Sequence, residues 1–112
     1  MALPARIRHK SGRENAGKRC PGHCTFVRNH ECSVPGCHAR PIEVAHVRTG
    51  TGGGLGVKPS DRWVISLCRD HHAEQHRIGE SSFEKRHGID MKALAEEFAR
   101  LSPHAPKLRE MI

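Results

Sequence analysis

Histidines at metal-ligand spacing are the residues of this chain best suited to chemistry. His72 and His76 are four residues apart, so a helix would place both imidazoles on one face, where they can bind one divalent cation. Such pairs also occur on protein surfaces by chance. His46 follows a β-rich segment, and a neutral imidazole can accept a proton from water near neutral pH. Considered alone, His46 is better explained as a half-buried strand histidine that is hydrogen-bonded to a loop carbonyl.

Two Cys/His pairs have the spacing of zinc knuckles. Cys32 and Cys37 enclose a Pro-Gly turn, and Cys68 and His71 follow where a strand is expected to meet a helix. Four soft or borderline donors from two tight turns match the tetrahedral preference of zinc. A structural zinc would also stabilise a chain whose hydrophobic core is small.

Cys20 and Cys24 form a competing pair, which could replace Cys32 and Cys37, hold a second zinc or remain ordinary thiols. We favour Cys32 and Cys37 because they lie nearer the expected strand. The chain has five cysteines and no apolar N-terminal segment typical of a secretory signal. We therefore expect a cytoplasmic location, where cysteines mixed with histidines indicate metal binding rather than disulfides.

The pattern of apolar residues, glycines and prolines predicts a small α+β domain. We expect a flexible basic arm over residues 1–19 and one folded domain over residues 20–112. Residues 20–38 are expected to form metal-knuckle loops with a short helix near Phe26. The regular elements are predicted as strands at 41–47 and 63–67, a glycine-rich loop at 49–60, and helices at 69–78, 80–87 and about 91–102.

The net charge of +7 favours a polyanionic partner such as nucleic acid, although a solvated basic surface is the simpler explanation of charge alone. No apolar stretch is long enough to span a membrane. The glycine-rich loop lacks the spacing of a phosphate-binding P-loop, which argues against an NTPase.

Cys32 to Cys37, Glu43-Val-Ala-His46 and the run from Leu67 to His76 together resemble the HNH, or ββα-metal (His-Me finger), nucleases. They are most similar to the recombination-enhancement (Ref-like) branch of phage and prophage HNH proteins. The resemblance covers residues 20–88 and implies two short antiparallel strands and a helix around one catalytic metal. Structural zinc knuckles and C-terminal helices at about 80–102 would complete the fold.

The resemblance also implies the role of each site residue. His46 matches the general base, and His72 and His76 match the ligands of a catalytic divalent ion, Mg²⁺ or Mn²⁺ in cells. The metal would stabilise charge on the scissile phosphate while His46 deprotonates the attacking water. The structural Zn²⁺ set would be Cys32, Cys37, Cys68 and His71.

This sequence departs from the family pattern at two positions. Many members have Asp or His immediately before the base as a further metal ligand, whereas this chain has Ala45. The middle Asn of the family name is also missing. Asp61 is our candidate replacement, either orienting His46 or completing the metal shell.

We therefore expect a metal-dependent endonuclease that hydrolyses phosphodiester bonds in DNA with little sequence preference. A recombination or phage DNA-processing protein is a possible partner. The alternative is a non-catalytic zinc module that binds DNA or protein. A zinc hydrolase of small substrates is disfavoured, since the His-Glu-x-x-His order is absent. Basic residues that flank the expected site and could hold phosphates are Arg48, Lys58, Arg62, Arg69 and Arg77.

Overall fold

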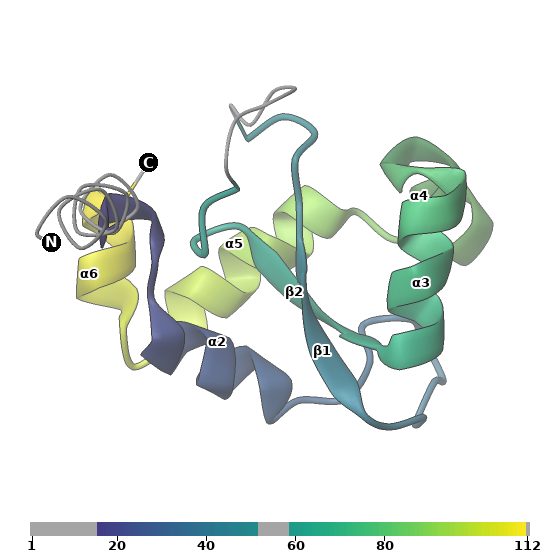
Figure 1. Cartoon of the computed structure of the whole chain (residues 1–112), viewed down its shortest axis with the longest axis horizontal. Coiled ribbons are helices and arrows are strands. Elements are labelled where there is room, and N and C mark those ends of the chain that lie inside the picture. The colour runs from purple at the N-terminus through teal and green to yellow at the C-terminus, as the bar shows by residue number, and fades with distance from the viewer. Residues whose placement is uncertain (1–15, 52–58, 112) are drawn as a thin grey trace, which may run out of the picture.

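A two-stranded antiparallel sheet lies at the centre of the protein (Figure 1). The computed structural model describes residues 16–51 and 59–111. Strand β1 (Ile42–His46) pairs with β2 (Val64–Cys68), with Ile42 opposite Cys68 and His46 opposite Val64. Both strands lie within one residue of the ranges expected from the sequence, and the mixed α+β class is confirmed for the described residues.

Five α-helices and one 3₁₀ helix accompany the sheet in the described chain. They are η1 (Ala16–Lys18), α2 (Pro21–Arg28), α3 (Arg69–Ile78), α4 (Glu80–His87), α5 (Met91–Leu101) and α6 (Ala105–Glu110). The three helices expected after the second strand are confirmed as α3, α4 and α5. Knuckle loops with a short helix near Phe26 were expected over residues 20–38, and residues 21–28 of this stretch form that helix. It begins at Pro21, in the first-turn position that proline tolerates. Helix α6 was not predicted from the sequence.

Local capping explains where these helices begin and end. The Asp90 carboxylate accepts a 3.0 Å hydrogen bond from the Ala93 N–H and so starts α5. Gly88 ends α4 with φ of 64°, a left-handed conformation that glycine adopts without steric penalty. Cys68 starts α3, because its Sγ accepts from the His71 N–H at 3.4 Å. The last strand residue and the helix cap are therefore the same residue.

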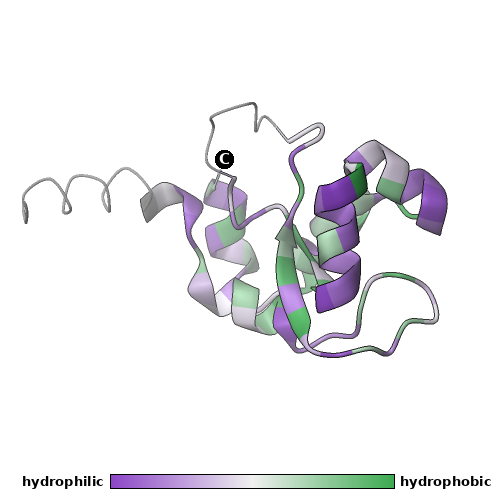
Figure 2. Ribbon diagram, turned by 45° about the vertical axis from the view of Figure 1, so that its right-hand side comes forward, coloured by the Kyte–Doolittle hydropathy of each residue, from purple (hydrophilic) through white to green (hydrophobic). Residues whose placement is uncertain are grey.

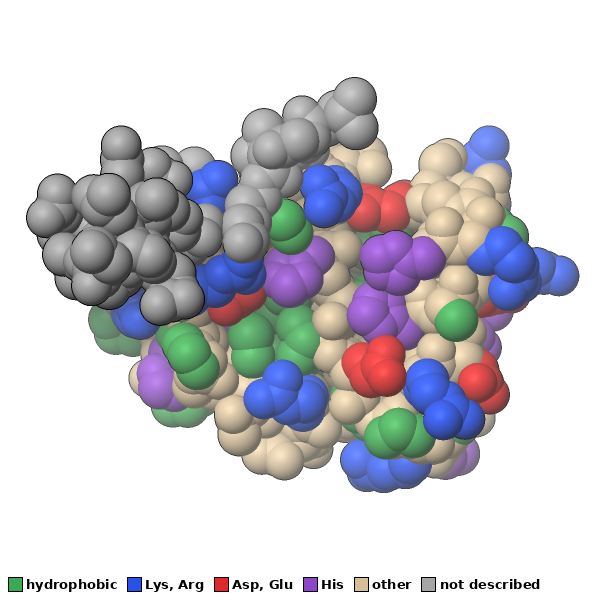
Figure 3. Space-filling view, in the orientation of Figure 1, with side chains coloured by type: hydrophobic (Ala, Val, Ile, Leu, Met, Phe, Trp, Pro, Cys, Tyr) green, Lys and Arg blue, Asp and Glu red, His purple; other side chains and the backbone are tan. Residues whose placement is uncertain are grey.

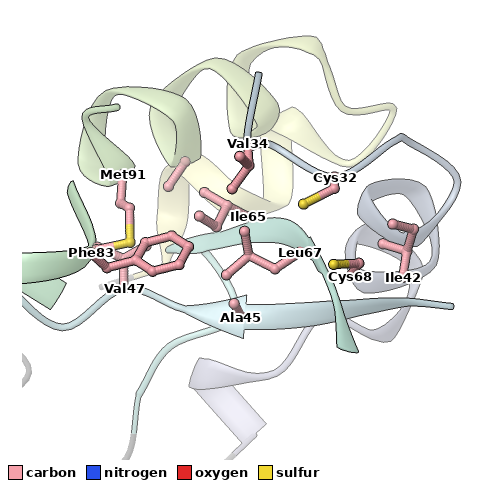
Figure 4. Close-up of a cluster of buried hydrophobic side chains, with 11 residues drawn as sticks. Cys32, Val34, Ile42, Ala45, Val47, Ile65, Leu67, Cys68, Phe83 and Met91 are labelled. Carbon is pink, nitrogen blue, oxygen red and sulfur yellow. The ribbon is translucent and has the colours of Figure 1, made fainter. Parts of the chain in front are cut away.

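The hydrophobic core lies between the sheet and the helices that follow it. Figure 4 shows Phe83 beside Met91 at one end of this core, Leu67 near its middle and two cysteines at the other end. Hydrophobic residues concentrate along the two strands, whereas the outer surfaces of the helices are largely hydrophilic (Figure 2). Helix α5 packs on β2, and α2 contacts both strands.

The segment before α2 is attached to the folded domain. The Lys18 carbonyl accepts a 2.8 Å hydrogen bond from the Asp61 N–H, and Cys20 is buried with Ala99 of α5 and Leu108 of α6. The sequence analysis assigned residues 1–19 to a basic arm, of which residues 1–15 lie outside the described residues. Among the described helices, none combines the length and apolar character needed to cross a membrane.

We predict that Phe83→Ala lowers the free energy of unfolding by about 3–5 kcal/mol, because Phe83 is 0% exposed and its removal leaves a cavity in a small core. Leu101→Ala is the matched control: this side chain is 57% exposed, so the change should be within about 0.5 kcal/mol. Urea unfolding followed by circular dichroism measures both values. Equal losses in the two variants would contradict the assignment of the core.

Candidate functional site

The four residues predicted as zinc ligands lie together. The ligand atoms of Cys32, Cys37, Cys68 and His71 are all within 4.8 Å of one another. His71 Nδ1 is 3.3 Å from Cys68 Sγ and 3.4 Å from Cys32 Sγ, and Cys37 Sγ is 3.9 Å from Cys68 Sγ. The cluster joins three segments: the loop before β1, the end of β2 and the first turn of α3.

The chemistry of these four donors suits a cation. Burial raises the pKa of the Cys32 thiol to about 11, because little water is present to solvate a thiolate there. A divalent ion would compensate the charge of the three thiolates. Three thiolates and one imidazole complete a tetrahedral donor set, so the cluster could hold a metal ion such as zinc.

The competing pair, Cys20 and Cys24, lies elsewhere. Cys20 is buried against α5 and α6, and neither cysteine belongs to a Cys/His cluster among the described residues. Burial, followed by the proximity of Asp61, raises the pKa of Cys24 to about 11. The geometry therefore favours Cys32 and Cys37 as the partners of Cys68 and His71.

A second group of donors shares His71 with the cysteine cluster. The ligand atoms of His71, Glu74 and His87 also lie within 4.8 Å of one another. The Glu74 carboxylate accepts hydrogen bonds from His87 Nε2 at 2.5 Å and from Arg86 Nη1 at 3.1 Å. A second cation would have to displace these contacts. We therefore interpret Glu74 as the carboxylate that pairs with His87 and Arg86 beside the cysteine cluster.

An open cleft of about 340 Å³ separates β1 from α3 and the start of α4. His46, His72 and His76 all line it, so the structure brings together the three histidines that the sequence analysis singled out. Val44 lines the cleft with His46, whereas Ala45 and Val47 are buried in the core, so the side chains alternate over residues 44–47. Ile42 at the start of β1 departs from this alternation, because it is buried in the same core. Figure 3 shows histidine side chains gathered near the middle of this face, with acidic and basic side chains around them.

The paired histidines of α3 face each other. His72 Nε2 and His76 Nε2 are 3.2 Å apart, as helical i and i+4 spacing allows. His72 Nδ1–H donates a 2.8 Å hydrogen bond to Glu43 Oε1 of β1. Because a carboxylate only accepts, this contact fixes the tautomer of neutral His72 and leaves its Nε2 lone pair directed at His76.

Asp61 holds the histidine at the end of β1. His46 Nε2–H donates a 2.9 Å hydrogen bond to Asp61 Oδ1, and the Cys20 N–H donates to Asp61 Oδ2 at 2.9 Å. Burial by itself would raise the pKa of Asp61. The hydrogen bonds from His46 and Cys20 and the charge of Arg19 outweigh burial and lower this pKa to about 2. This contact has the geometry that the first of the two roles expected for Asp61, orienting His46, requires.

The basic residues expected to hold phosphates do not form one cluster. Arg48 lines the cleft, and Arg69 and Arg77 are exposed on α3. Arg62 borders a different cavity beside α5 and α6, with its guanidinium carbon 4.1 Å from the centre of the Trp63 ring. Lys58 lies outside the described residues.

The sequence analysis gave no role to Glu43 or Arg19. Glu43 lies on β1 and its partner His72 lies on α3, so only the docking of the helix against the strand brings them together. Arg19 was placed in a flexible arm, yet its Nη1 is 3.3 Å from Asp61 Oδ1. No local pattern indicates either contact. For Glu43 the one available signal was its proximity to His46 in the sequence.

Comparison with known proteins relates the chain to a relative and to a family whose descriptions name no activity. The Escherichia coli (strain K12) protein described as "Uncharacterized protein YdfU" is 33% identical over 70 residues, which cover 62% of this chain and 19% of that protein. The chain thus spans about a fifth of the length of this relative. No solved structure matches significantly. The model of the family described as "Protein of unknown function (DUF968)" matches residues 13–102, most of the 112-residue chain, and the chain therefore belongs to this family.

Proposed function

We propose that this protein is a metal-dependent endonuclease that hydrolyses phosphodiester bonds in DNA, with the ββα-metal arrangement of HNH nucleases. The observation that carries the proposal is that His46 of β1 and the His72–His76 pair of α3 line one cleft. Two antiparallel strands followed directly by a helix, with a Cys₃His cluster at their junction, support it further.

His46 is the general base in this proposal. Its Nε2–H donates to Asp61, so the neutral ring has its Nδ1 lone pair available to accept a proton from water. The low pKa of Asp61 keeps this carboxylate ionised at neutral pH. Asp61 thus favours the required tautomer of His46 and stabilises the imidazolium that proton uptake produces.

His72 and His76 would bind the catalytic divalent ion, for which Mg²⁺ or Mn²⁺ are the proposed identities. A bound cation supplies Lewis-acid stabilisation of the charge that develops on the phosphate oxygens. Glu43 orients His72 through the hydrogen bond that it accepts from Nδ1–H. Ala45, the residue before His46, is 0% exposed and offers no ligand atom. The proposal therefore assigns two imidazoles, those of His72 and His76, as the protein donors to this ion.

Zinc is the proposed occupant of the cysteine cluster, where its role would be structural. Cys32, Cys37, Cys68 and His71 provide four protein donors and leave no position for water or substrate. The alternative function, a zinc module that binds DNA or protein without cutting, uses the same four residues. The two functions differ in whether the histidines of the cleft react.

We predict that the parent protein relaxes supercoiled plasmid DNA in the presence of Mg²⁺ or Mn²⁺, and that His46→Ala lowers the rate by about 10²–10⁴-fold, since the base is removed. His38→Ala is the matched control, because the His38 side chain is 77% exposed and pairs with Glu31 away from the cleft. It should cut at the parental rate. Equal cleavage by parent and His46→Ala would exclude this base, and intact plasmid with a fully metal-loaded parent would favour the non-catalytic module.

We predict one zinc ion per chain, measured by elemental analysis of the purified protein. Cys68→Ser should abolish zinc binding and lower the melting temperature, because Cys68 belongs to the cluster and also starts α3. Cys24→Ser is the matched control and should retain zinc. Loss of zinc from the Cys24 variant but not from the Cys68 variant would show that the wrong cysteines are assigned.

We predict a pH-dependent contribution of Asp61 to stability. Its pKa of about 2 in the folded protein lies below the ordinary value of 3.8, so the ionised carboxylate contributes about 2 kcal/mol above pH 4 and loses this contribution as the pH falls toward 2. Asp61→Asn should therefore be less stable than the parent at pH 6, and the difference should shrink below pH 4. Thermal unfolding of the parent and of Asp61→Asn, measured from pH 6 down to pH 2.5, tests this prediction. Any loss of metal in acid affects both proteins alike. A constant difference down to pH 2.5 would be inconsistent with the low pKa.

A further inference from the structure

One carboxylate oxygen beside the cleft binds two nitrogen donors. Asp61 Oδ1 accepts from His46 Nε2 at 2.9 Å and from Arg19 Nη1 at 3.3 Å. Because both donors meet at one atom, the guanidinium group of Arg19 lies next to the imidazole of His46. Arg19 therefore belongs to the surroundings of the proposed base, although it is far from His46 in the sequence.

The backbone around Arg19 is fixed in this position. Its predecessor Lys18 accepts the Asp61 N–H through its carbonyl at 2.8 Å, and its successor Cys20 donates its N–H to Asp61 Oδ2 at 2.9 Å. Three consecutive residues thus contact residue 61. A side chain held between two such contacts pays less entropy on binding a ligand than one on a free arm.

The contact with Asp61 does not satisfy the guanidinium group of Arg19. Arg19 makes this one hydrogen bond among the described residues, whereas a guanidinium group carries five N–H donors. Its side chain is 35% exposed, so the remaining donors can reach a ligand from solvent. A single 3.3 Å contact at this exposure contributes little to stability by itself.

We propose that Arg19 forms a phosphate-binding subsite that holds a phosphodiester group of the DNA strand beside the bond on which His46 acts. The inference rests on the proposed function. Helix α2 and the segment before it lie on the opposite side of the sheet from α3 and α4 (Figures 1 and 2). The DNA backbone would therefore pass from the His72–His76 pair across His46 to Arg19.

Arginine is suited to this double contact. Its planar fork can donate to the Asp61 carboxylate from one edge and to a phosphate from another, and it stays charged at all working pH values. Asp61 would then align the base and the phosphate-binding group through one oxygen atom. Lysine would supply the charge but not this fixed geometry.

The test measures DNA binding in a His46→Ala background, so that cleavage does not interfere. A short fluorescent DNA duplex is titrated at salt concentrations of about 50–200 mM for the background protein and for Arg19→Gln, Arg19→Lys and Arg28→Ala. The Gln variant can still donate to Asp61 but carries no charge. Arg28 is exposed on α2 and, among the residues that the structure describes, donates to Thr25 alone, at 3.4 Å, so it is the matched control for a lost charge.

We expect Arg19→Gln to bind about tenfold more weakly at low salt and to reduce the slope of log affinity against log salt by about one, as for the loss of one phosphate contact. Arg19→Lys should keep the slope, and Arg28→Ala should match the background protein. An unchanged slope in the Gln variant, with zinc content and melting temperature as in the background, would overturn the assignment. If Arg19→Gln weakens DNA binding as expected but the parent protein, which carries His46, does not cut DNA, the proposed function is contradicted and the phosphate-binding subsite remains supported.

Discussion

The convergence of three sulfurs and one imidazole at the end of β2 is the constraint on which the rest of the described structure depends. Cys68 ends β2, caps α3 through its contact with the His71 N–H, and belongs to the cluster. If α3 left β2 in a different direction, the four side chains of the cluster would therefore no longer lie together. Cys32 extends the constraint to the core, where it is buried with Ile42 and Leu67. Only 4% of the residues in this chain are aromatic, so apolar burial alone stabilises the fold weakly. A metal bound here would add its binding free energy to the stability of the fold.

The direction of α3 determines what the cleft contains. The helix leaves β2 at Cys68 and turns back along β1, so that His72 meets Glu43 while His76 shares the cleft with His46 farther along the strand. Glu43 and His46 along the strand thus lie in the same order as His72 and His76 along the helix. This correspondence follows from the strand register, in which Ile42 lies opposite Cys68 and His46 lies at the far end of the pair. The cysteine cluster consequently positions histidines that it does not contact.

Local sequence signals predicted most of the elements but not the contacts between them. Alternation predicted the strands, Gly88 and Asp90 predicted the boundaries of the later helices, and close spacing predicted the His72–His76 pair. Helix α2 was expected only as a short helix near Phe26 between metal-knuckle loops, because cysteines, proline and glycine in residues 20–38 also suit such loops. Glu43 and Arg19 were missed because both act across long sequence separations, on residues brought near by the docking of α3 and by the attachment of residues 18–20 to Asp61.

Residues of the short strand β1 serve both the hydrophobic core and the cleft, and Ala45 belongs to the core. Its side chain is fully buried within the apolar cluster, so a carboxylate or imidazole there would carry a polar group into the core at a considerable desolvation cost. Ala45 of the strand and Val47 just after it therefore pack in the core, whereas Val44 and His46 of the strand line the cleft. In the proposed nuclease the protein donors to the cation must then come from α3, and Glu43 acts indirectly by orienting His72. Two imidazoles bind a hard cation such as Mg²⁺ weakly, so phosphate oxygens of the substrate would have to complete its coordination.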